Sequence, residues 1–136
     1  MMKNLKSTLL KWFLIVSGVI QICYWGISHL FFPQWYLHSV GMNALAENPG
    51  DVLIFMNEIG ILTIGLGIAT ILVSFNPVKN IAIIIVLYLI SFGSMVTSLY
   101  HILYKSTGGG EWMTVFIILI QLIILTILYP WKELKN

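Results

Sequence analysis

The sequence predicts an all-α integral membrane protein built as an antiparallel bundle of four transmembrane helices. Apolar residues make up 59% of the 136 residues and charged residues only 9%, whereas a soluble domain carries roughly 25% charged residues. Four apolar runs reach the length of about 20 residues that a helix needs to cross the hydrocarbon core. All four prolines lie at the edges of these runs, where a helix tolerates a residue that cannot donate to its hydrogen-bond ladder.

The four spans are expected to be antiparallel neighbours along the chain, because the second and third connections are short. Asn76-Pro77 is typical of a helix start, with Asn as the N-cap and Pro at the first helical position. The triple glycine Gly108–Gly110 is typical of a flexible turn before the last span. The predicted spans run from about Leu9 to Phe32, Asp51 to Phe75, Val78 to Tyr104 and Trp112 to Tyr129.

The lysines predict the orientation. The chain has seven Lys and no Arg, and basic residues gather on the cytoplasmic side of a membrane protein. If both termini are cytoplasmic, only Lys105 lies outside. The abundant Ile and Lys indicate an AT-rich bacterial genome, so we expect the cytoplasmic membrane of a bacterium. The lysines then inside are Lys3, Lys6, Lys11, Lys79, Lys132 and Lys135.

The outer loop at 33–50 contains no Lys or Arg. Its start, Pro33 to Val40, is rich in aromatic residues and suits a segment that lies flat in the headgroup region. A plain connection between helices is the equally open alternative. Glu47, Asp51 and Glu111 are expected at the outer rim as caps and solubilising groups.

Composition also limits the partners. A net charge of +2 without a basic patch excludes a nucleic-acid-binding surface. The single cysteine, Cys23, lies inside an apolar run, so no intrachain disulfide forms. The lipid bilayer is the one partner that the composition itself implies.

Ionisable residues inside the spans point to a candidate site, because burying a charge in lipid is expensive. At about 1.5 Å per residue, Glu58 lies roughly 7 Å outside the midplane, and His29 and His101 each lie about 12 Å outside it. Three different helices therefore bring one carboxylate and two imidazoles to the same outer half. The residues expected to line this site are Gln21, Trp25, Asn57 and Ser98.

Four interpretations of this group stay open. In the favoured one, the chain is a non-enzymatic binding or accessory protein, and Glu58 anchors a small or lipid-like ligand in an intramembrane pocket. In the structural one, the histidines are interfacial and a protonated Glu58 bonds to Asn57, Gln21 or a serine. No cofactor is predicted, but a membrane oxidoreductase component or metal-dependent enzyme would use His29 and His101 for haem, or both with Glu58 for a divalent metal. A small proton-coupled transporter would use Glu58 alone.

Small residues form a ridge along the second span. Such ridges let two helix backbones approach closely in lipid. The ridge serves packing within one bundle or, alternatively, a homo-oligomer interface. Its members are Gly60, Thr63, Gly67, Thr70 and Ser74.

Four segments carry a resemblance to a known family. They are "FFP" at Phe31–Pro33, "NEIGILTIGLGIATIL" at Asn57–Leu72, the turn at Asn76–Lys79, and "LYHILY" at Leu99–Tyr104. With these segments the chain resembles small four-helix membrane proteins of the DoxX-like and BphX-like kind. The resemblance implies the four-span fold and an accessory or subunit-like role in the cytoplasmic membrane, in some members linked to quinone redox chemistry.

Overall fold

The computed structural model describes residues 2–105 and 109–129, so Gly108, Lys132 and Lys135 lie outside the described residues. Every regular element in these two ranges is a helix, which confirms the all-α prediction. The elements are α1 (Met2–Ile20), the π-helix η1 (Gln21–Gly26), α2 (Ile27–Phe31), α3 (Pro33–Ser39), α4 (Asn43–Glu47), α5 (Val52–Val73), α6 (Ile81–Lys105) and α7 (Gly109–Leu128).

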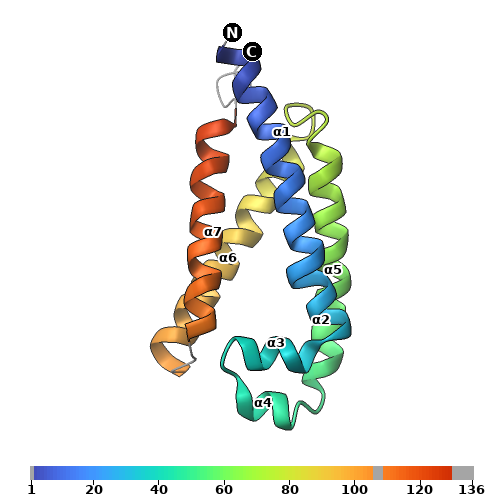
Figure 1. Cartoon of the computed structure of the whole chain (residues 1–136), viewed down its shortest axis with the longest axis vertical. Coiled ribbons are helices and arrows are strands. Elements are labelled where there is room, and N and C mark those ends of the chain that lie inside the picture. The colour runs from blue at the N-terminus through green and yellow to red at the C-terminus, as the bar shows by residue number, and fades with distance from the viewer. Residues whose placement is uncertain (1, 106–108, 130–136) are drawn as a thin grey trace.

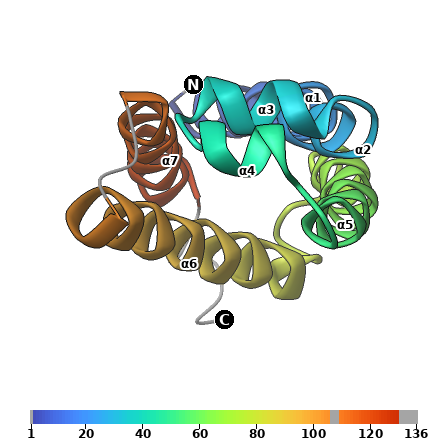
Figure 2. The same ribbon diagram turned by 90° about the horizontal axis from the view of Figure 1, so that it is seen from below.

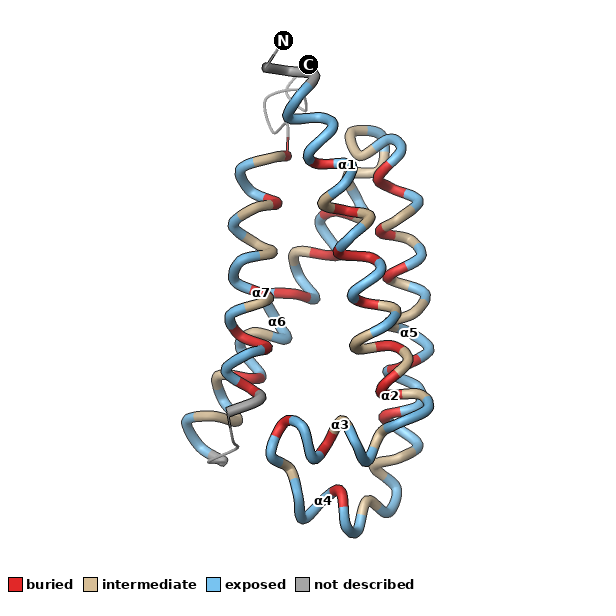
Figure 3. The backbone as a smooth tube through the Cα atoms, viewed as in Figure 1, coloured by how far each residue is buried: buried red, intermediate tan, exposed pale blue. Residues whose placement is uncertain are grey.

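Four helices in the described residues are long and apolar enough to cross a membrane, as the sequence predicts. Their mean hydropathies lie between 1.6 and 2.3, and large apolar side chains cover their outward faces. Figure 3 shows exposed positions along the full length of each of these helices. The chain is therefore an integral membrane protein. The candidate spans are Leu5–Phe31, Val52–Val73, Ile81–Tyr104 and Glu111–Leu128.

The four long helices form a closed ring in the order α1, α5, α6 and α7, as the end-on view in Figure 2 shows. Packing is closest within two pairs, one made of α5 with the first span and one made of α6 with α7. α1 begins and α7 ends at one end of the bundle, which we call the terminal end. The short helices α3 and α4 cross the opposite end (Figure 1), which we call the α3–α4 end.

The first span is not one regular helix. A π-helix of six residues, Gln21–Gly26, separates α1 from α2. π-Helical turns are rare, and they occur frequently at functional sites. Hydrophobic periodicity predicts a single continuous helix here, because one wider turn leaves the apolar pattern of the span almost unchanged.

Glycines bring the first span against α5. A Cβ atom on Gly18 would lie 2.6 Å from the carbonyl oxygen of Gly67, and a Cβ on Gly60 would lie 2.9 Å from the carbonyl oxygen of Gly26. Only glycine allows backbones to approach this closely. Gly60 and Gly67 belong to the small-residue ridge predicted on the second span. That ridge therefore packs within one bundle.

A core at the terminal end joins the two pairs. The Tyr129 hydroxyl also donates to the carbonyl oxygen of Pro77 at 3.3 Å, which fixes the end of α7 to the turn between α5 and α6. All four long helices contribute to the core through side chains that are at most 3% exposed. These are Leu10, Leu14, Val73, Ile84, Leu87, Leu125 and Tyr129.

The segment at 33–50 forms two short helices rather than an irregular loop. Pro33 opens α3 at its first position, and Gly41, at φ 85°, allows the turn into α4. This segment packs against Met56 of α5 through Leu37 and Ala46.

Candidate functional site

The candidate site lies at the α3–α4 end and begins with a buried carboxylate. Glu111 stands in the first turn of α7, where the helix dipole stabilises a negative charge. The residue is only 6% exposed. Its Oε1 atom lies 3.5 Å from Nδ1 of His101, which α6 provides. A carboxylate and an imidazole thus meet between α6 and α7.

His29 provides the second imidazole, from α2. Its Nδ1 donates to the carbonyl oxygen of Trp25 at 2.5 Å, since a carbonyl can only accept. In the neutral ring this leaves Nε2 as an acceptor. The ring is buried against Tyr36 of α3, with the two centroids 4.0 Å apart.

Tyr36 connects the two halves of the site. Burial raises the pKa of its hydroxyl well above the usual value, and the negative charge of Glu111 and the neighbouring Tyr24 raise it further, whereas a hydrogen bond from Trp25 acts in the opposite direction. The hydroxyl therefore stays neutral at physiological pH. We call His29, Tyr36, His101 and Glu111 the polar end cluster.

Two of the residues expected to line the site have structural roles. Gln21 is buried, and its Oε1 accepts from the Thr70 hydroxyl at 3.2 Å, which ties η1 to α5. Asn57, with its amide nitrogen turned toward α2, donates to the carbonyl oxygens of His29 at 3.3 Å and Leu30 at 3.2 Å. Pro33 has no N–H to offer the carbonyl of His29, so Asn57 supplies the missing donor.

The structure brings the other predicted residues together only in part. Ser98 is buried on α6, one turn before His101, and Trp25 lies beside Tyr36. Glu58 is exposed on α5, and within the described residues it has no hydrogen bond or ion pair. The carboxylate found beside an imidazole is that of Glu111.

Sequence reasoning missed Glu111 and Tyr36. Glu111 was expected at the rim as a solubilising group, and its burial corrects this expectation. The sequence spacing could have indicated this burial, because Glu111 shares a helical face with the buried Thr114, Ile118 and Leu125. Tyr36 carried no such signal, since its burial depends on how α3 folds across the bundle.

A metal site finds no support in this geometry. Within the described residues, no group of three or more His, Cys, Asp or Glu side chains could hold a metal ion. His29, His101 and Glu58 are all described residues, so this finding covers the three ligands that the metal alternative requires.

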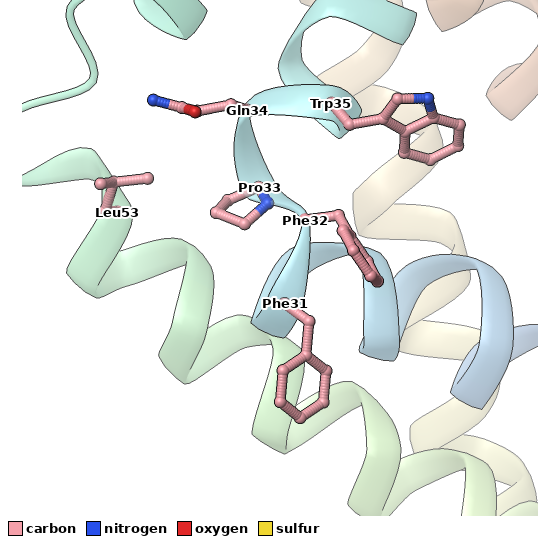
Figure 4. A pocket seen from close by; sticks show the side chains of 6 residues that line it. All are labelled: Phe31, Phe32, Pro33, Gln34, Trp35 and Leu53. Atoms are coloured by element: carbon pink, nitrogen blue, oxygen red, sulfur yellow. The ribbon is translucent and has the colours of Figure 1, made fainter.

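A separate hollow lies at the bend between α2 and α3. Its volume is about 380 Å³, and no member of the polar end cluster lines it. Figure 4 shows that Gln34 and Trp35 point to opposite sides of the start of α3. Exposed aromatic rings here favour an interfacial position for α3, which stays a prediction. The lining residues are Phe31, Phe32, Pro33, Gln34, Trp35 and Leu53.

Comparison with known proteins gives a family but no function. The model of a family described as "Family of unknown function (DUF6790)" matches residues 2–135. No curated protein and no solved structure matches the chain. The match covers nearly the whole chain, and it does not support the DoxX-like or BphX-like assignment suggested by the hydrophobic and glycine motifs.

Proposed function

The chain belongs to DUF6790, a family of unknown function, and we propose that it is a non-enzymatic membrane protein that binds a small or lipid-like ligand at the polar end cluster. The observation that carries this proposal is the burial of Glu111 beside His101, with its charge acting on Tyr36, whose ring lies against His29. Removing a carboxylate from water costs several kcal/mol. A cluster of this kind at one end of a lipid-soluble bundle is typical of a site that uses the charge.

The hydrogen-bonding capacity of the cluster suggests the ligand chemistry. The Glu111 carboxylate accepts only, and Nε2 of neutral His29 is an acceptor as well. The ring of Tyr36 lies against His29, and aromatic faces attract cations. The favoured ligand is therefore an amphiphile whose head group donates hydrogen bonds, such as an amine or an alcohol.

We test this with three amphiphiles of equal chain length: dodecylamine, 1-dodecanol and dodecanoic acid. Native mass spectrometry of the purified protein counts bound molecules. The amine and the alcohol should bind in preference to the acid. Glu111→Gln should weaken amine binding about tenfold or more, because it removes a charge-assisted hydrogen bond.

Matched controls lie at the same end of the bundle. Glu47→Gln and His38→Phe change an exposed carboxylate and an exposed imidazole, so both variants should bind the amine as the wild type does. His29→Phe should weaken binding as Glu111→Gln does. Equal binding by all four variants would exclude the site.

The sequence-based assignment of Glu58 is tested in parallel. Glu58→Gln should leave amine binding unchanged if the polar end cluster alone forms the site, and should weaken it if Glu58 also contributes. Proton release on addition of the amine, abolished by Glu58→Gln, would instead assign transport. A Soret band lost in His29→Ala or His101→Ala would assign haem.

We also propose that both termini face the cytoplasm of a bacterial cell, which places the polar end cluster on the outer side. The excess of lysines toward the termini supports this orientation. In a Cys23→Ser background, a membrane-impermeant thiol reagent on intact cells should label Asn48→Cys and not Asn4→Cys. Labelling of Asn4→Cys alone would show that the protein has the opposite orientation.

A further inference from the structure

A second group of polar side chains lies outside the polar end cluster, in a groove between α1 and α7. The groove has a volume of about 140 Å³. Its walls include Phe13 and Val16 from α1 and Ile117 and Ile120 from α7. Val16 is 53% exposed and Ile120 55% exposed, so the groove opens sideways from the bundle. In a membrane this opening faces the acyl chains.

Two polar side chains also line the groove, Ser17 of α1 and Gln121 of α7. Each lies near the middle of its candidate span, Leu5–Phe31 or Glu111–Leu128. Within the described residues, no hydrogen bond is found for the Ser17 hydroxyl or for the Gln121 amide. An unpaired polar group in hydrocarbon costs several kcal/mol, because lipid offers no partner. The groove is thus incomplete in the protein alone.

The dimensions and chemistry of the groove limit what can complete it. An apolar cavity of about 150 Å³ holds one benzene molecule, so the groove accepts one six-membered ring. None of its lining residues is charged, and a charge at the centre of the bilayer would be costly. The amide and the hydroxyl can both donate to an oxygen and accept from one.

We propose that the α1–α7 groove binds an uncharged, membrane-dissolved molecule with a ring-sized body and a carbonyl or hydroxyl oxygen. Gln121 and Ser17 hold that oxygen, and the apolar walls hold the ring. Ser17 is only 8% exposed and so lies recessed below the walls. A small molecule reaches such a position more readily than the surface of a neighbouring helix does.

Photolabelling in lipid vesicles tests the proposal. The probe is a phenol that carries a diazirine, and its control is the same molecule with a methyl group in place of the hydroxyl. The phenol should label peptides that contain 13–20 and 117–121. Gln121→Leu should reduce this labelling about fivefold, the value of one hydrogen bond, and should leave labelling by the methyl control unchanged.

Two further variants make the outcome decisive. Ile117→Trp fills the groove but keeps the Gln121 amide, so it should block labelling by both probes. Thr97→Val removes an exposed hydroxyl elsewhere, on α6, and should change nothing. The proposal is overturned if labelling spreads evenly over all lipid-facing helices, if Gln121→Leu leaves phenol labelling intact, or if the groove crosslinks to a second copy of the chain.

Discussion

Tyr36 illustrates how a single residue acquires a role from its surroundings. In the sequence it is one aromatic residue in an outer loop. In the structure its ring covers His29, and its hydroxyl lies within the field of the Glu111 carboxylate. Burial and that negative charge both disfavour the tyrosinate, so the raised pKa of Tyr36 reports directly on the assembly of the polar end cluster.

Alkaline unfolding should therefore depend on Tyr36. The unfolded chain releases this proton above about pH 10, whereas the folded chain keeps it until a higher pH. The contribution of Tyr36 to stability is complete below about pH 10 and is lost as the pH rises toward the folded pKa. In this range the loss approaches about 1.4 kcal/mol per pH unit.

Denaturant unfolding in detergent micelles at about pH 9 and about pH 11 measures this effect. Tyr36→Phe keeps the ring against His29 and removes the titrating hydroxyl, so the variant should lose less stability over this interval than the wild type. Tyr104→Phe changes a tyrosine that is 73% exposed and should match the wild type. Identical pH slopes for Tyr36→Phe and the wild type would contradict the burial of this hydroxyl.

Among the elements, the pairing of α5 with the first span depends on glycine. A Cβ atom on Gly67 would lie 2.8 Å from the carbonyl oxygen of Gly18 and 2.6 Å from Cγ1 of Ile22. The carbonyl belongs to the backbone of a packed helix and cannot move aside. Gly65, on the same helix, faces open space, and a Cβ atom there would meet no atom within 4 Å.

Gly67→Ala should thus destabilise the protein by about 1–3 kcal/mol through overpacking. Gly65→Ala is the matched control, and it should be neutral or slightly stabilising, because alanine favours the helix by up to about 1 kcal/mol over glycine. Thermal or denaturant unfolding in micelles gives both values. A similar loss in the two variants would mean that the ridge does not hold α5 against the first span.

The elements also show how far the sequence alone could lead. Long apolar runs bounded by proline and glycine predict four membrane helices, because length and hydropathy are local properties. The π-helix at Gln21–Gly26 and the burial of Glu111 could not be predicted in this way. The first depends on a single wider turn, and the second on the way α6 packs against α7.

For the whole molecule, the core at the terminal end joins the two helix pairs. Lipid is as apolar as leucine, so this core holds the pairs through close packing rather than through the exclusion of water. Leu87 of α6 is 2% exposed and lies inside the core, whereas Leu89, two residues further along, is 66% exposed on the outward face. Substitutions at the two leucines therefore distinguish the effect of packing between the pairs from the effect of contact with lipid.

Leu87→Ala should cost about 2–5 kcal/mol, because the cavity it leaves lies among helices of both pairs and can collapse only partly. Leu89→Ala should cost much less, since lipid chains fill the vacated space. Unfolding in micelles measures both variants, and crosslinking between α1 and α7 reports whether the pairs stay joined. If Leu87→Ala proved as mild as Leu89→Ala, the pairs would have to be held instead at the α3–α4 end, where the charge of Glu111 acts on Tyr36.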